Sequence, residues 1–227
     1  MNAPQNWPRQ GYPQQQPPYG PPPPRKKRTG LVVGILITVV VLVVGGVAAV
    51  LYLDYTAPAG TSGAGEQPLP QCDIGAETRK SAKVGKFRLA GKPTDSGLKI
   101  SNCFWEQGDE DGKDKRVLQI QVYDHSAQTK DEARSRKLAE DDYANLASAP
   151  YGGDQAKPLD GLGDQATYVA PGTKTYATEV DLVVRKGLVI YRVAYSGEDK
   201  GFFGSSAFPV EDAEAVVREV AEDLVAK

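Results

Sequence analysis

The chain has 227 residues, of which 40% are hydrophobic and 25% charged, and a formal net charge of -2. This length allows one or two domains. The charge is split: residues 1–53 carry five basic residues and no acidic ones, so the other 22 Lys and Arg against 29 Asp and Glu give residues 54–227 a net charge of -7. An acidic domain repels phosphate backbones, which excludes nucleic acid as a partner.

Residues 1–29 are rich in Pro, Gln and Gly and end in a basic cluster at residues 25–28. Such a composition cannot bury enough apolar area to offset chain entropy, so it predicts a disordered tail. The proline-rich sequence leaves two interpretations open. It is either a docking ligand for a partner or a solvated tail with no dedicated partner, and the solvated tail is favoured because composition alone decides little.

Residues 30–53 form the next segment, whose apolar run at 31–53 holds no charged residue. As a helix this run is about 34 Å long, enough to cross a hydrocarbon core of about 30 Å. Cationic flanks stay on the cytoplasmic side of a membrane. We therefore predict a single-pass plasma-membrane protein with a cytoplasmic N-terminus and an extracytoplasmic C-terminal domain.

A cleaved signal peptide is the alternative, because Ala57-Pro58-Ala59 resembles an A-x-A cleavage site. The apolar run is longer than the 7–15 residues of a signal peptide, which favours a retained anchor. A lipid-modified cysteine is disfavoured, since Cys72 lies well beyond the apolar run. Residues 54–69, rich in Gly, Ala and Pro, are predicted to be a flexible linker.

Residues 70–227 are predicted to form one extracytoplasmic domain that contains both cysteines, Cys72 and Cys103. An even cysteine count in an oxidising compartment predicts a disulfide between them. A metal site would need further ligands, and the chain has one histidine, His125. No metal site and no cofactor is predicted.

Hydrophobic periodicity predicts an α+β domain, with an antiparallel sheet of about five strands and helices packed on one face. The expected order is α-β-β-α-β-β-β-α. The predicted helices span residues 76–84, 129–146 and about 209–227, and the predicted strands span 98–106, 116–124, 165–170, 176–185 and 188–196.

Motifs of known catalytic chemistry are absent from the sequence: there is no G-x-S-x-G, no phosphate-binding loop and no H-E-x-x-H. His125 follows a predicted strand, which is typical of a surface or capping residue. The acidic run of Asp109, Glu110, Asp111 and Asp114 fails the calcium-loop pattern, because Lys113 falls at its fifth position. This run is predicted to be a solvated hairpin tip, and the chain is predicted not to be an enzyme.

Two loops leave alternatives open. Residues 151–164 are either a binding loop or a tight turn that places Leu162 in the core, with the turn favoured because glycine has a backbone reason to be there. Phe202 and Phe203 form either an exposed contact patch or, as favoured here, a cap on the end of the sheet.

A resemblance to a known family rests on several features together. They are the Pro/Gln/Gly-rich tail, the single span, the linker, Cys72, Cys103-Phe104-Trp105, the sequence GLGDQA at 161–166 and LVI at 188–190. Over residues 70–227 the chain resembles actinobacterial exported lipoproteins and single-pass membrane proteins of unassigned function. Its layout is similar to the extracellular sensor domains of actinobacterial serine/threonine kinases.

Both resemblances imply an antiparallel α+β fold in which a disulfide, here Cys72–Cys103, pins the N-terminal segment to the sheet. Neither implies an active site. The chain departs from the lipoproteins in lacking a lipobox, and from the kinases in having a short tail in place of a kinase domain.

The expected function is a non-enzymatic, membrane-anchored binding or accessory module of the cell envelope, with an envelope ligand or a membrane-protein partner. One alternative is an envelope hydrolase that uses carboxylates such as Asp160 and Asp164. The other is a structural subunit of a larger membrane complex.

Overall fold

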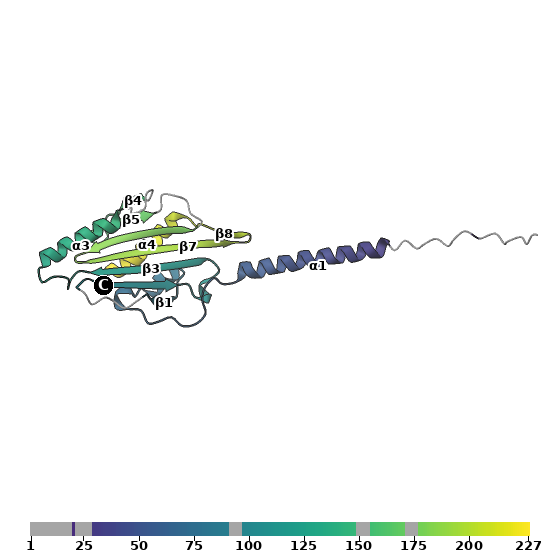
Figure 1. Cartoon of the computed structure of the whole chain (residues 1–227), viewed down its shortest axis with the longest axis horizontal. Coiled ribbons are helices and arrows are strands. Elements are labelled where there is room, and N and C mark those ends of the chain that lie inside the picture. Colours follow the sequence, from purple (N-terminus) through teal and green to yellow (C-terminus); the bar gives the residue numbers. More distant parts are fainter. Residues whose placement is uncertain (1–19, 21–28, 91–96, 149–154, 171–176) are drawn as a thin grey trace, which may run out of the picture. The chain divides into compact units, whose positions relative to one another are not determined.

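A computed structural model describes residue 20 and residues 29–90, 97–148, 155–170 and 177–227 (Figure 1). The chain divides into two compact units, Met1–Gly46 and Val47–Lys227. The predicted disordered tail, residues 1–29, lies almost wholly outside the described residues.

Helix α1 (Thr29–Thr56) contains the apolar run. Among the described residues, α1 is the one helix that is long and apolar enough to cross a membrane. None of its most apolar stretch is buried against protein. The helix continues past the predicted span through Asp54 and Tyr55. The direction in which it would cross stays a prediction.

The described part of the domain contains one antiparallel sheet of eight strands, not five, in the order β1-β2-β3-β7-β6-β5-β4 with β8 paired to β7. The strands are β1 (Lys86–Leu89), β2 (Lys99–Glu106), β3 (Lys115–Asp124), β4 (Gln155–Pro158), β5 (Gln165–Ala170), β6 (Thr178–Lys186), β7 (Val189–Gly201) and β8 (Gly204–Ser206). The α+β class and the antiparallel arrangement are confirmed.

The three strands that the sequence does not indicate are short: β1 and β4 have four residues each and β8 has three. Strand β4 is exposed at every position and ends in Pro158, so it shows no alternation of apolar and polar residues. Such strands are defined by pairing with a neighbour rather than by their own side chains.

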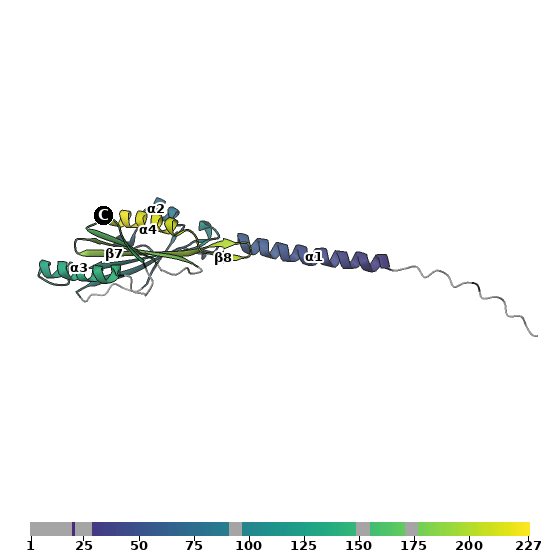
Figure 2. The same ribbon diagram turned by 90° about the horizontal axis from the view of Figure 1, so that it is seen from above.

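Helices cover both faces of the sheet, so the prediction of helices on one face is wrong (Figure 2). Helices α2 (Ala76–Ser81) and α4 (Val210–Val225) lie on one face and α3 (Glu132–Ala147) on the other. The cause is visible in β6, where six consecutive residues are buried. Side chains alternate between the two faces of a strand, and burial of both faces requires cover on both.

The larger core lies on the α4 face, and a smaller one under α3 joins Tyr143, Val183 and Ile190. The larger core includes Trp105, Leu118, Ile120, Val180, Leu182, Val184, Val193, Tyr195, Val217, Val220 and Leu224. The predicted start of α3 near residue 129 is early, because Asp131 is the N-cap and accepts hydrogen bonds from the backbone N–H groups of Ala133 and Arg134.

The segment after α1, expected from its composition to be a flexible spacer, is hydrogen-bonded along the domain in the structure. The N–H of Ala59 donates to the Gly112 carbonyl at 3.1 Å, and that of Glu66 to the Phe87 carbonyl at 2.9 Å. A Cβ at Gly60 would stand 2.1 Å from the Gly108 carbonyl oxygen. The glycine therefore permits a close backbone approach, which brings the domain directly to the end of α1.

Tyr195 lies in the larger core, where its hydroxyl donates to the Ala82 carbonyl at 2.9 Å. Burial raises the pKa of Tyr195 from 10.0 to about 12, against the lowering effect of Arg116. Because the folded pKa lies above the unfolded one, this stabilisation is fully present below pH 10 and is lost as the pH rises toward 12.

Replacing Tyr195 with phenylalanine is therefore expected to have an effect that depends on pH. Near pH 7 the variant loses about 1 kcal/mol, because the Ala82 carbonyl loses its donor. Between pH 10 and 12 the difference in the free energy of unfolding narrows and then reverses. Only the wild type has the Tyr195 phenol, and its ionisation removes roughly 2–3 kcal/mol of stability. Urea unfolding at several pH values measures both quantities, and parallel stability curves for the two proteins would contradict the assignment.

Candidate functional site

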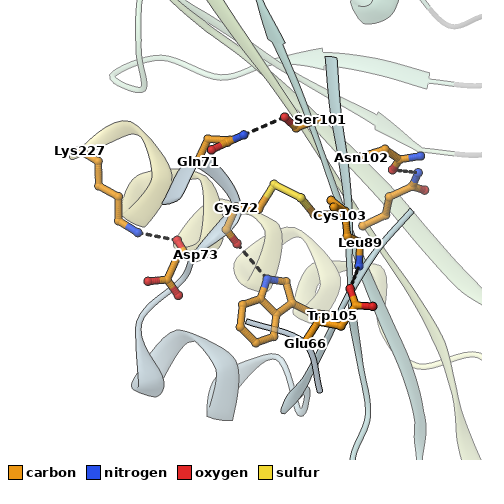
Figure 3. The surroundings of a disulfide bond; sticks show 11 residues. Glu66, Gln71, Cys72, Asp73, Leu89, Ser101, Asn102, Cys103, Trp105 and Lys227 are labelled. Atoms are coloured by element: carbon orange, nitrogen blue, oxygen red, sulfur yellow. Dashed lines mark hydrogen bonds between the residues drawn. A yellow bond between two sulfur atoms is a disulfide. The ribbon is translucent and has the colours of Figure 1, made fainter. Parts of the chain in front are cut away.

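The disulfide joins the short 3-10 helix η1 (Pro70–Cys72) to the middle of β2 (Figure 3). Both cysteines are fully buried, and the Trp105 indole N–H donates to the Cys72 carbonyl at 3.0 Å. On the other side of the bridge, the Gln71 amide donates to the Ser101 hydroxyl at 2.8 Å. Three bonds thus hold this segment against the sheet.

A hollow of about 320 Å³ opens beside this junction, at the end of β2, β3 and β7. Its lining residues are Gln71, Lys99, Ser101, Val122, Asp124, Val189 and Tyr191. The strand register places six of them in two adjacent rows, Lys99–Asp124–Val189 and Ser101–Val122–Tyr191. Alternation puts both rows on the face that carries the disulfide. The next row along is Cys103–Ile120–Val193, so the disulfide lies beside one end of the hollow.

The hollow combines apolar and polar groups in a way that is common in ligand sites. Val122 and Val189 supply apolar surface from rigid strands, and Lys99 and Asp124 lie opposite each other at the rim. These two charges form no ion pair within 4.0 Å, although both residues are described. Small-molecule sites have apolar walls with a few polar groups that orient the ligand.

Tyr191 supplies a further hydrogen-bonding group to the hollow. Burial, followed by the nearby Asp124 carboxylate, raises the pKa of its phenol above the usual value. Like the phenol of any tyrosine, it is protonated at neutral pH and is able to donate a hydrogen bond. Asp124 uses one carboxylate oxygen to accept from the Ser126 N–H at 2.9 Å, which fixes its orientation.

A second hollow, of about 370 Å³, lies where the sequence suggests a binding loop, and both Asp160 and Asp164 line it. Asp164 accepts from the Arg185 guanidinium at 3.2 Å and from the Gly187 N–H at 2.8 Å, so its carboxylate fastens the loop to β6. The first part of the loop, 151–154, lies outside the described residues, and the next part is β4.

The favoured interpretation of this loop as a tight turn is confirmed for Leu162, which is buried in the larger core. Gly163 has a φ of +61°, and a Cβ there would stand 2.5 Å from the Arg185 carbonyl oxygen. Glycine is therefore needed for the backbone path, as expected.

The acidic run at the β2–β3 turn is divided among separate structural roles. Asp111 accepts from the Gly108 N–H at 2.6 Å, Asp114 pairs with Lys83 at 2.9 Å, and Asp109 accepts from the Ser62 hydroxyl. Within the described residues, no group of three or more His, Cys, Asp or Glu side chains is arranged to hold a metal ion.

The sequence predicts that His125 is a surface or capping residue; its side chain is fully buried, so the surface position is wrong. Its Nδ1 lies 2.5 Å from the Gln128 amide oxygen, and its Nε2 lies 3.4 Å from an Asp142 carboxylate oxygen on α3. Its backbone N–H donates to the Leu188 carbonyl at 3.0 Å. Within the described residues Nε2 makes no hydrogen bond, so the imidazole lies between the end of β3 and α3 and is oriented through Nδ1 by Gln128; it lines neither hollow.

The sequence did not single out Lys99, Asp124 or Tyr191. The register that places them together depends on pairing among β2, β3 and β7, and β7 joins the sheet about 65 residues after β3. The sequence held one indication of the hollow. Lys99 and Ser101 share a face of β2 with the buried Cys103 and Trp105, so polar residues precede buried ones on the same face.

Comparison with known proteins assigns no family. No family model matches the chain, and no curated protein matches it significantly. The solved extracellular domain of PknH from Mycobacterium tuberculosis aligns with a TM-score of 0.37 and 9% identity, over 72% of this chain and 100% of that chain. A likeness this distant carries no conclusion about the family or the function of this chain. The exported-protein family stays a prediction.

Proposed function

We propose that this protein is a non-enzymatic binding module anchored by α1 in the plasma membrane, with its disulfide-containing domain in the cell envelope. The disulfide and the long apolar helix α1 support an extracytoplasmic domain. The observation that carries the binding role is the hollow at the end of β2, β3 and β7, where opposite charges flank an apolar floor without pairing to each other.

The chemistry of this hollow favours a small zwitterionic or amide-containing ligand with an apolar portion, such as a short envelope peptide. A ligand carboxylate would face the Lys99 ammonium, and a ligand amine or amide N–H would face the Asp124 carboxylate. The Tyr191 phenol and the Gln71 amide would orient the remaining polar groups. A ligand of this kind completes the charge pairing that the protein leaves open.

Thermal unfolding of the full-length protein in nanodiscs, against muropeptides, glycans, lipids and divalent ions, tests the proposal. A ligand that binds only the folded state adds about 2.7 kcal/mol of stability at one hundred times its dissociation constant. We expect peptide-bearing fragments to raise the midpoint. The increase should be lost in Lys99→Gln and in Asp124→Asn, because each variant removes one of the two charges that the ligand pairs with.

The matched control is Lys80→Gln, which removes a cation from a different hollow, between α2 and the β2–β3 turn. This variant should retain the full increase. A ligand whose effect survives both Lys99→Gln and Asp124→Asn would place the binding site elsewhere. Turnover of a panel member that is abolished by Asp160→Asn would instead favour the hydrolase.

A further inference from the structure

Two phenylalanines form the tip of the hairpin between β7 and β8. The rings of Phe202 and Phe203 stack edge to face, with centroids 4.8 Å apart, and the residues are 40% and 91% exposed. The prediction that they cap the end of the sheet is wrong. Within the described residues Asp199, Lys200 and Gly201 pair only with β8, so the hairpin extends past the strands that flank β7.

This hairpin contacts the last turn of α1, immediately after the apolar run. The Phe202 ring lies 5.9 Å from the Tyr55 ring, and the Lys200 ammonium donates to the Asp54 carbonyl. On the same ring, the Lys113 ammonium lies 3.2 Å from the Tyr55 centroid. Only two residues separate the end of α1 from Ala59, which is already hydrogen-bonded to the domain. An extended residue spans at most about 3.6 Å, so this short connection keeps the end of the helix close to the domain.

If α1 spans the bilayer, as proposed above, its last turn lies where the hydrocarbon ends and the headgroups begin. Aromatic residues are enriched at that level, and the transfer of exposed apolar side chains out of water there is favourable. Tyr55 lies in that last turn, and its contact with Phe202 places the hairpin tip at the same level. We infer that the β7–β8 hairpin is a second membrane contact, with Phe202 and Phe203 in the outer headgroup region of the bilayer that α1 crosses.

The charges around the hairpin indicate that this contact is apolar rather than electrostatic. Asp199 pairs with Arg116, and Lys200 lies 3.8 Å from the Asp54 carboxylate. Arg116 and Lys200 are thus balanced by acids, Lys113 lies over the Tyr55 ring, and residues 54–227 as a whole are acidic. Anionic lipid is not required, so phosphatidylcholine alone is a sufficient probe and high salt should leave the contact intact.

Spin labelling of the full-length protein in phosphatidylcholine nanodiscs tests the inference. Cys72 and Cys103 are bonded to each other, so Phe203→Cys supplies the single reactive thiol. A nitroxide there should collide more with membrane-dissolved oxygen than with a water-soluble nickel chelate. A label at Ala133→Cys, exposed on α3 beyond the far end of β3, should show the opposite preference. Equal preference at the two positions overturns the inference.

A second pair of variants controls for the preference of the apolar spin label itself for lipid. A nitroxide at Ser205→Cys should lie near lipid in the unaltered hairpin and move into water when Phe202→Ser and Phe203→Ser are added. An unchanged oxygen preference would show that the phenylalanines do not hold the hairpin at the membrane, and would overturn the inference. Dipolar broadening between labels would likewise overturn it, in favour of contact with a second copy. Far-UV circular dichroism should be unchanged, because neither ring belongs to the core.

Discussion

Replacing both Cys72 and Cys103 with serine is expected to lower the free energy of unfolding by roughly 3–4 kcal/mol. The bridge closes a loop with a sequence separation of 31 residues, and without it the unfolded chain gains conformational freedom. The segment that the bridge holds contributes one wall of the candidate ligand hollow through Gln71. The variant should therefore lose ligand binding as well as stability.

Thermal unfolding of the full-length protein without reductant measures the stability loss. A thiol reductant serves as the matched control, because it should lower the midpoint of the wild type toward that of the variant and leave the variant unchanged. Equal midpoints for the two proteins under oxidising conditions would show that the bridge adds no stability.

The parts of this fold that the sequence predicted are those whose side chains repeat regularly. The alternation of Leu118, Ile120 and Val122 identified β3, and the spacing of Val217, Val220 and Leu224 identified α4. The apolar run of α1 was equally clear. These patterns are local, so they survive without knowledge of the neighbours.

The parts that the sequence did not predict depend on contacts between distant segments. Strand β4 is exposed at every position and is defined by its pairing with β5, and α3 lies on its own face because Val183 and Ile190 point away from the larger core. His125 is buried because α3 folds over the end of β3. The ligand hollow has the same origin, since strands distant in sequence bring its two charged rim groups beside Tyr191.

Replacing Trp105 with alanine is expected to be the most destabilising single substitution, at about 3–5 kcal/mol. The indole is 1% exposed, packs edge to face against Phe87 at 5.2 Å and lies beneath the Arg79 guanidinium at 5.2 Å. Its loss leaves a cavity in the larger core and removes the donor to the Cys72 carbonyl. Urea unfolding followed by circular dichroism measures the change, and a loss below 1 kcal/mol would contradict this packing.

Trp105→Phe separates the packing of the ring from its hydrogen bond. It keeps an aromatic ring in the core but leaves the buried Cys72 carbonyl without its donor, at a cost of about 1–3 kcal/mol. If the disulfide is what keeps that carbonyl buried, the hydrogen-bond part of this cost should disappear when both cysteines are serine, because the released carbonyl then bonds to water. The two changes would be strongly non-additive, as expected for neighbours that hold one segment. The same cost in both backgrounds would show that the 3-10 helix stays against β2 without its covalent bond.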